Sequence, residues 1–135
     1  LGTIMRTAEG AGVDGVILNR TSVDLYNPKV IRATMGSVYR MPFLYVEELA
    51  EVLPLLKQRG IRTYAAHLKG KNCYDQEDYR TGCAFLIGNE GNGLSGELSR
   101  RADTWVRIPM HGKLESLNAA VAASILMYEV CRQRR

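Results

Sequence analysis

Two loops hold the side chains best suited to chemistry in this 135-residue sequence. The first, residues 88–95 (GNEGNGLS), follows the apolar run AFLI and precedes a helical pattern. Its glycines let backbone amides approach a ligand closely, and Glu90 is a carboxylate without an obvious packing role in such a turn. The spacing matches neither G-x-G-x-x-G nor a phosphate-binding loop ending in Lys-Ser/Thr. The loop is either a ligand-binding turn of another kind or a tight strand-to-helix connection.

The second loop, residues 108–118 (IPMHGKLESLN), precedes the last helical segment. Ser116 is placed to cap that helix, because its hydroxyl oxygen can accept from a free amide of the first turn. Asn118 would then lie inside the first turn, where asparagine is a poor helix former unless it has another task. Arg6 lies among apolar residues of the first helical segment, where the ordinary role of an arginine is a solvated side chain.

The elements that must position these loops alternate between strand and helix. Apolar residues at helical spacing predict helices, as in residues 47–59, where acids come early and bases late. The predicted helices cover residues 2–11, 28–34 (capped by Asn27), 47–59, 94–102 and 117–132, and the predicted strands cover residues 13–19, 43–46, 61–66, 84–87 and 105–108. This alternation over short connections predicts an α/β fold with a mostly parallel sheet flanked by helices.

Composition predicts one ordinary globular domain. A hydrophobic content of 46% and a charged content of 24% are typical of folded proteins and exclude disordered and fibrous classes. The longest apolar stretch, residues 119–131, is shorter than the roughly 20 residues that a membrane span needs. A net charge of +4 permits a polyanionic partner without requiring one.

The cysteines and histidines predict no metal site. Cys73, Cys83 and Cys131 form no C-x-x-C pair, and we interpret them as reduced thiols of a cytoplasmic protein. His67 and His111 are too few to complete a tetrahedral zinc site. Each lies beside a predicted strand end, where a structural role is more common than a catalytic one.

The last predicted helix is apolar on nearly every face. Such a helix must be covered on more than one side, either by its own sheet and a partner subunit or wholly within one core. Small residues at 119, 120 and 122–124 (all alanine except Ser124) would allow a second copy to approach closely. We therefore predict a homodimer formed through the C-terminal helix.

Three segments, taken in order, resemble the motifs of the SpoU/TrmH family of RNA ribose methyltransferases. They are LGTIMRTA at residues 1–8, LIGNEGNGLS at 86–95 and IPMHGKLESLNAAVAASILMYE at 108–129. VIRATMGS at residues 30–37 resembles the family's segment between the first two motifs. The resemblance covers nearly the whole chain, and three ordered motifs are more specific than any single glycine-rich loop.

The resemblance implies a fold of the SPOUT type, in which the C-terminal segment threads through a loop to form a deep trefoil knot. It also implies S-adenosylmethionine as the methyl donor, without a metal. Carried over by position, the donor contacts fall on Ala66, Gly88, Ile108 and Leu117, largely through backbone groups. Ile108, Met110 and Leu117 would provide the apolar walls that adenine needs.

The implied reaction transfers a methyl group to a ribose 2′-hydroxyl of transfer or ribosomal RNA. By position, the family's catalytic residues are Arg6, Glu90, Ser116 and Asn118. The reaction needs in-line placement of donor and acceptor and removal of a proton from a weakly acidic hydroxyl. Because arginine stays protonated above about pH 12, we interpret Arg6 as holding the target phosphate and stabilising the forming alkoxide. Glu90 and Asn118 would orient Arg6 and the motif loops.

The chain departs from the family pattern at its start. The family's first motif opens with an asparagine that would precede Leu1, and a strand should precede that asparagine. We therefore expect residues 1–135 to be a catalytic domain from a longer protein, without its first strand or any separate RNA-binding domain. RNA would then contact basic side chains of the domain, each of which could equally be a solvated charge. The candidates are Arg20, Lys29, Arg32, Arg40, Lys69, Lys71 and Lys113.

Two other functions use a similar fold. One is an RNA-binding module without methyl transfer, against which the presence of Arg6, Glu90, Ser116 and Asn118 argues. The other is a nicotinamide-dependent oxidoreductase. The absence of G-x-G-x-x-G after the first strand argues against it.

Overall fold

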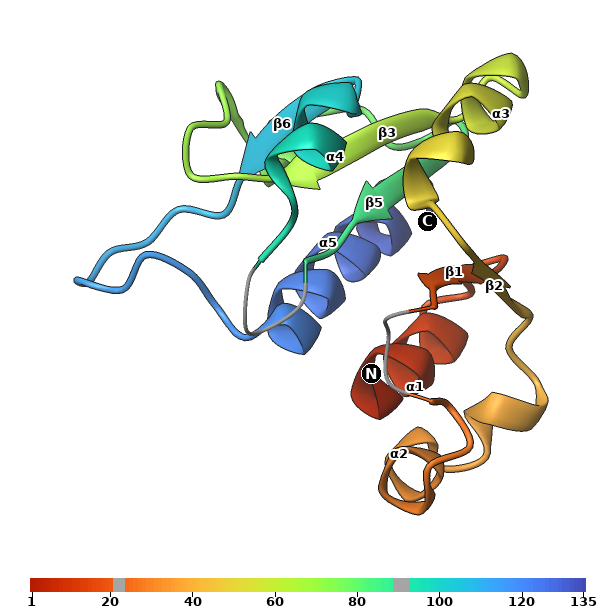
Figure 1. Cartoon of the computed structure of the whole chain (residues 1–135). Helices are drawn as coiled ribbons and strands as arrows, with labels where there is room; N and C mark the ends of the chain where they lie inside the picture. Colours follow the sequence, from red (N-terminus) through yellow and green to blue (C-terminus); the bar gives the residue numbers. More distant parts are fainter. Residues whose placement is uncertain (21–23, 89–92) are drawn as a thin grey trace. The chain divides into compact units, whose positions relative to one another are not determined.

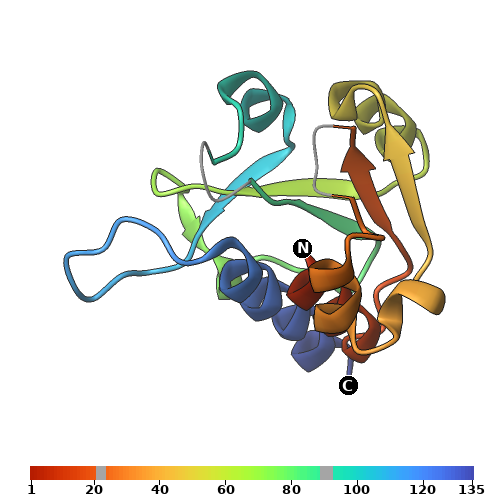
Figure 2. The ribbon, with the colours of Figure 1, turned by 60° about the horizontal axis from the view of Figure 1, so that its bottom comes forward.

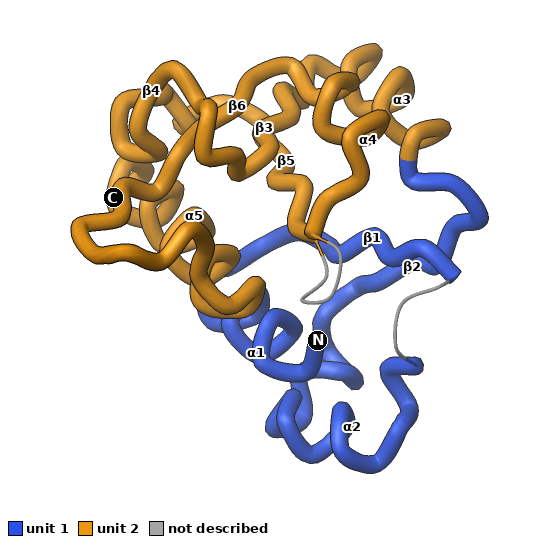
Figure 3. The backbone as a smooth tube through the Cα atoms, turned by 60° about the vertical axis from the view of Figure 1, so that its left-hand side comes forward, with its two compact units in different colours: residues 1–49 blue, residues 50–135 orange. Residues whose placement is uncertain are grey.

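The computed structural model describes residues 1–20, 24–88 and 93–135. The chain divides into two compact units, Leu1–Leu49 and Ala50–Arg135, which Figure 3 colours separately. Figure 1 labels the helices and strands along the chain. All strand pairs of the described residues are parallel, as the sequence predicts. Apart from residues 47–59, the predicted elements are present, with bounds that differ by no more than three residues at either end.

The first unit combines two helices with a two-stranded sheet. Its elements are α1 (Gly2–Gly10), β1 (Val16–Asn19), α2 (Pro28–Thr34), a 3₁₀ turn (Ser37–Tyr39) and β2 (Phe43–Val46). β1 and β2 pair in register from Val16 opposite Phe43 to Asn19 opposite Val46. Gly2 is required where α1 meets α2, because a Cβ there would lie 2.5 Å from the Ala33 Cβ.

Local chemistry of the first unit agrees with the predicted cap of α2. Asn27 caps that helix by accepting from the Lys29 amide at 3.0 Å, and Pro28 occupies its first turn. Glu9 of α1 accepts from the Ser37 hydroxyl at 2.8 Å and from Arg40 at 2.7 Å. The Arg40 guanidinium and the Ser37 hydroxyl together hold the pKa of the Glu9 carboxyl below its usual value.

The second unit contains a four-stranded sheet of order β4-β6-β3-β5. Its elements are a 3₁₀ turn (Leu49–Glu51) that continues from the first unit, α3 (Leu53–Gln58), β3 (Arg62–Ala66), β4 (Asn72–Cys73), a 3₁₀ turn (Tyr74–Gln76), β5 (Cys83–Leu86), α4 (Gly96–Arg101), β6 (Thr104–Arg107) and α5 (Ala119–Arg134). β4 was not predicted, because two residues are too few to show a strand period. The residues that follow β4 begin with a 3₁₀ turn.

The predicted single helix over residues 47–59 is wrong. Leu49–Glu51 forms a 3₁₀ turn, and the α-helix covers only Leu53–Gln58. Pro54 explains the break, because proline has no amide hydrogen and its ring clashes with the carbonyl four residues earlier. A helix tolerates proline in its first turn, and α3 begins one residue before Pro54.

The four-stranded sheet has α5 on one face and α4 on the other (Figure 2). Tyr64 of β3 and Val106 of β6 lie on the α5 face, where they form a buried cluster with Tyr79 and Leu126. Trp105, the residue before Val106, points to the opposite face, and its indole donates to the Ser99 carbonyl of α4 at 2.7 Å. This alternation is the two-residue period of a strand buried on both faces.

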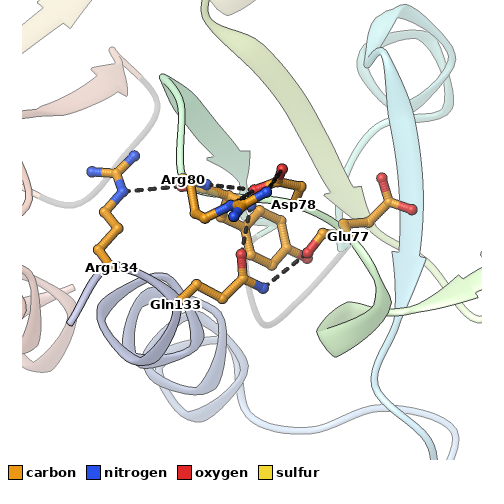
Figure 4. A network of polar contacts seen from close by, with 6 residues as sticks. Glu77, Asp78, Arg80, Gln133 and Arg134 are labelled. Atoms are coloured by element: carbon orange, nitrogen blue, oxygen red, sulfur yellow. Dashed lines mark hydrogen bonds and ion pairs between the residues drawn. The ribbon is translucent and has the colours of Figure 1, made fainter.

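The end of α5 is hydrogen-bonded to the segment that precedes β5 (Figure 4). Gln133 accepts from the Tyr79 amide at 2.7 Å and donates to the Glu77 carbonyl at 2.8 Å. Arg134 donates to the Tyr79 carbonyl at 3.0 Å and to the Thr81 carbonyl at 2.7 Å. We term Gln133, Arg134 and the segment 77–81 that they bind the C-terminal clamp. It satisfies backbone groups of a segment that has no strand partners there.

A helix that crosses a membrane needs about 20 mostly apolar residues. None of the helices in residues 1–20, 24–88 and 93–135 is both long and apolar enough to cross a bilayer.

Candidate functional site

Three of the predicted donor-binding residues lie at one edge of the four-stranded sheet. Ala66 ends β3, Gly88 follows the end of β5, and Ile108 directly follows β6. β3 pairs in parallel with both β5 and β6, so the carboxyl ends of these strands are neighbours. We term this the carboxyl edge. In open parallel sheets, ligands bind beyond this edge.

An open hollow of about 380 Å³ lies at the carboxyl edge. Its volume is within the range of small-molecule pockets, about 300–1,000 Å³. The lining residues are Leu68, Arg107, Ile108, Pro109, Met110, Gly112, Leu114 and Glu115. Ile108 and Met110 are therefore at the hollow, as expected of donor-binding residues, whereas Ala66, Gly88 and Leu117 do not line it.

The lining of the hollow combines apolar side chains with two charged residues, Arg107 and Glu115. Most of the lining side chains are aliphatic or proline. The Arg107 guanidinium is held by the chain itself, since it donates to the Gly70 carbonyl at 2.9 Å and to the Lys71 carbonyl at 3.2 Å. Glu115 is exposed and brings a carboxylate to the lining. Apolar walls with one exposed carboxylate fit a ligand that joins an aromatic ring to a positive charge.

Gly88 has a structural explanation. A Cβ at this position would lie 2.2 Å from the Leu94 amide nitrogen and 2.3 Å from the Gly93 carbonyl carbon. The chain thus returns across Gly88 so closely that only glycine fits. Gly88 also lies at the carboxyl edge, just after β5, so the close approach of residues 93 and 94 leaves both interpretations of Gly88 open.

Residues 108–118 include two of the predicted catalytic residues, Ser116 and Asn118. Asn118 is the cap of α5, since its Oδ1 accepts from the Ala120 amide at 2.8 Å and from the Val121 amide at 3.4 Å. The prediction that Ser116 caps this helix is therefore wrong, and Ser116 is exposed in the loop before it. Serine and asparagine cap about equally well, so the loop geometry makes the choice.

The other two predicted catalytic residues lie elsewhere. Arg6 is an exposed residue of α1 in the first unit, next to the buried Met5. Among the residues the structure describes, the Arg6 side chain has no hydrogen bond or ion pair. Glu90 lies outside the described residues, so the catalytic set is seen only in part.

His67 is held more firmly than its sequence position indicated. Its ring stacks on Trp105 with centroids 4.1 Å apart and an interplanar angle of 20°. Its Nδ1 accepts from the Lys69 amide at 3.0 Å, and its own amide donates to the Val106 carbonyl. Sequence reasoning placed His67 at a strand end but could not find the stack, which depends on β3 pairing with β6. Arg107 was missed, although a charged residue at the end of a buried strand was a visible signal.

In the described part of the chain, the side chains that could bind a metal ion do not gather, and the cysteines are free thiols. In residues 1–20, 24–88 and 93–135, no three His, Cys, Asp or Glu side chains gather in a way that could hold a metal ion. Cys73, Cys83 and Cys131 are free and partly buried. Burial raises the pKa of the Cys83 thiol, which keeps it protonated at neutral pH.

Comparison with known sequences gives a family match over most of the chain. Residues 1–128 match the family described as the SpoU rRNA Methylase family. A Staphylococcus aureus protein, named for the TrmH family of tRNA/rRNA methyltransferases, is 40% identical over 135 residues, which cover 99% of this chain and 54% of that protein. The chain thus spans about half the length of the curated relatives it matches.

Comparison with solved structures gives the same family and confirms the predicted α/β fold. The SpoU methyltransferase AviRb from Streptomyces viridochromogenes, in complex with the cofactor AdoMet, matches with a TM-score of 0.91 and 35% identity over 98% of this chain and 52% of that one. An RNA 2′-O ribose methyltransferase matches with a TM-score of 0.87 and 38% identity, over 98% of this chain and 51% of that one.

Proposed function

Because this chain belongs to the SpoU rRNA Methylase family, we propose that it is the S-adenosylmethionine-dependent catalytic domain of an RNA methyltransferase. Its reaction is transfer of a methyl group to a ribose 2′-hydroxyl of tRNA or rRNA. The observation that carries this proposal is the apolar hollow at the carboxyl edge, which includes Ile108 and Met110 from the third family motif. The AdoMet complex of AviRb and the 2′-O ribose methyltransferase named above support it.

The donor site is formed by the carboxyl edge. Ile108 and Met110 supply apolar walls for the adenine ring from the hollow. Ala66, Gly88 and Leu117, which do not line the hollow, supply backbone hydrogen bonds, as the family motifs imply. When bound, S-adenosylmethionine supplies an activated methyl group on a sulfonium centre. The contribution of the chain is to position the donor, to exclude water from its aromatic ring and to offer a carboxylate near its positive charge.

The acceptor is activated by charge and placement. The exposed Arg6 guanidinium holds the phosphate of the target nucleotide and stabilises the 2′-oxygen as its proton leaves. Asn118 fixes the start of α5 and so the third motif. By their positions in the family motifs, Ser116 and Glu90 are assigned to the same reaction. The role of Arg6 is therefore electrostatic rather than that of a base.

Assembly and location complete the proposal. Val121 and Tyr128, seven residues apart and so on one face of α5, are 49% and 51% exposed, which supports a homodimer through this helix. The free cysteines support a cytoplasmic location. Residues 1–135 act as one catalytic domain, and the trefoil knot implied by the family stays a prediction.

Calorimetric titration of S-adenosylmethionine into the chain tests the donor site. We expect micromolar binding that Leu114→Ala weakens about fivefold, because Leu114 lines the hollow and the change removes about 1 kcal/mol of apolar contact. Leu55→Ala is the matched control, since Leu55 is 58% exposed on α3, outside the hollow. Absence of donor binding, or equal effects of both variants, would contradict the proposed site.

Methyl transfer is then measured with labelled donor on unmodified tRNA and rRNA transcripts. We expect incorporation that disappears when the acceptor ribose carries no 2′-hydroxyl. Binding of donor and RNA without any incorporation would favour the non-catalytic RNA-binding module instead.

A further inference from the structure

The basic candidates for RNA contact are not equivalent in the structure. Arg20 is paired with Glu47 at 2.5 Å, and Arg40 is bonded to Glu9. Each of these two arginines therefore already has a carboxylate partner within the protein. Lys29 and Arg32 lie on α2, in the first unit. The remaining candidates, Lys69, Lys71 and Lys113, all lie in loops at the carboxyl edge.

These three lysines flank the hollow from two loops. Leu68, directly before Lys69, lines the hollow from the β3–β4 loop. Gly112 and Leu114, on either side of Lys113, line it from the β6–α5 loop. All three lysines are exposed, and none forms an ion pair with any of the described residues. One carboxylate, that of Glu115, lies among the residues that line the hollow.

The β3–β4 loop, residues 67–71, is held rigidly although it projects into solvent. Gly70 packs on β6 so closely that a Cβ would lie 2.7 Å from the Val106 carbonyl carbon. Arg107 donates to the carbonyls of Gly70 and Lys71, and His67 accepts from the Lys69 amide while stacking on Trp105. These contacts fix the backbone from which both lysines project, which lowers the entropic cost of binding a ligand there.

We propose that residues 67–71 form a rigid cationic platform on which Lys69 and Lys71 bind the phosphodiester backbone of the RNA beside the donor hollow, with Lys113 on the opposite side. This inference rests on the proposed function and deepens it, because it names where the substrate backbone lies. A fixed pair of exposed lysines without partner carboxylates suits phosphate groups, which supply most of the affinity of nucleic-acid binding without reading sequence.

The test is the salt dependence of binding to bulk tRNA, measured by fluorescence anisotropy on the chain. We expect Lys69→Ala/Lys71→Ala to weaken binding and to lower the slope of log affinity against log salt by about 2, one for each phosphate that the variant no longer binds. Lys57→Ala/Arg59→Ala is the matched control. It removes the same charge from the same unit. Lys57 and Arg59 precede the amino end of β3, which is opposite to the carboxyl edge.

A second variant tests the rigidity of the platform. His67→Phe keeps an aromatic ring on Trp105 but removes the acceptor of the Lys69 amide. We expect weaker tRNA binding with an unchanged salt slope, because both lysines still reach phosphates from a looser loop. An unchanged affinity would show that the bracing plays no part.

The outcomes separate this inference from the proposed function. An equal decrease of slope in both double variants would overturn the platform, because only net charge would then matter. Loss of S-adenosylmethionine binding in Lys69→Ala/Lys71→Ala would also overturn it, by assigning the lysines to the donor. A wild-type chain that binds the donor but no tRNA contradicts the platform alone, whereas one that binds neither contradicts the methyltransferase itself.

Discussion

The C-terminal clamp and the carboxyl edge use polar groups in opposite ways, although both belong to the second unit. In the clamp, Gln133 and Arg134 hydrogen-bond the backbone of residues 77–81, and the Tyr79 ring above them is fully buried. At the carboxyl edge, residues 109–116 form no helix or strand and are exposed apart from the partly buried Met110. Leu114 there is 71% exposed.

The difference separates stability from ligand binding. The polar groups of the clamp satisfy one another, so they stabilise the fold and have little capacity left for a ligand. The side chains of the carboxyl edge pack little against each other, which costs stability but leaves apolar and cationic groups available. At this edge, the exposed Lys69 and Lys71 project from a backbone that His67 and Arg107 hold by hydrogen bonds.

The largest predicted effect comes from Tyr79→Ala in the clamp. Tyr79 is fully buried, its ring lies 5.0 Å from Tyr64 and 5.3 Å from Phe85 in edge-on contacts, and its hydroxyl donates to the Tyr74 carbonyl. Removing the ring leaves a cavity and should lower the free energy of unfolding by about 3–5 kcal/mol. Urea denaturation followed by circular dichroism measures the change.

Leu114→Ala at the carboxyl edge is the matched comparison. Its side chain is mostly exposed, so we expect the free energy of unfolding to change by no more than about 0.5 kcal/mol. Similar losses of stability in the two variants would show that the loop is part of the core and would end the distinction between the two regions.

Local chemistry explains which elements could be predicted from the sequence. The cap of α2 by Asn27, with Pro28 behind it, depends on neighbours in the chain and was predicted correctly. The helix break before Pro54 also has a local cause. It was not predicted, because the leucines around Pro54 have the spacing of one continuous helix. The two residues of β4 gain their strand geometry only by pairing with β6, which no local pattern reveals.

The candidate site was predictable where motifs carried it. Ile108 and Met110 came from the third motif and line the hollow. Ser116 and Asn118 compete for the same cap with similar intrinsic preference, so sequence could not decide between them. The His67–Trp105 stack joins residues of two strands far apart in the chain, and it became visible only with the strand order.

The next prediction asks whether Asn118 acts only as a cap. Asn118→Ala should lower the free energy of unfolding by about 1 kcal/mol, because two amides of α5 lose their acceptor. Asn118→Ser keeps a capping oxygen and should restore most of this stability. If the amide also orients the catalytic set, both variants should lose about 10- to 100-fold in methyl transfer, as expected when one orienting hydrogen bond is removed. Full activity of Asn118→Ser would assign Asn118 to structure alone.

The smallest effect concerns the charge beside the clamp. The Glu129 carboxylate is 5% exposed and accepts from Arg132 at 2.6 Å and from Gln133 at 2.9 Å. The Arg132 guanidinium lowers the pKa of Glu129 despite its burial. Because folding favours the charged form of Glu129, it stabilises the protein fully at pH values above the pKa of the unfolded chain, about 4.3. This stabilisation is lost as the pH falls from there through the lower pKa of the folded state.

Glu129→Gln should therefore be less stable than the wild type at pH 7, with a difference that shrinks towards pH 3, where the wild-type carboxylate is also becoming protonated. Urea midpoints at the two pH values measure this. Glu97→Gln is the control, because Glu97 pairs with Arg101 on an exposed surface at 3.2 Å and should cost little at either pH. A difference for Glu129→Gln that persists undiminished at pH 3 would mean that shape rather than charge fixes this residue. The clamp would then stabilise the unit through packing and neutral hydrogen bonds. It would differ even more from the carboxyl edge, where the charges of the lysines are available to a ligand.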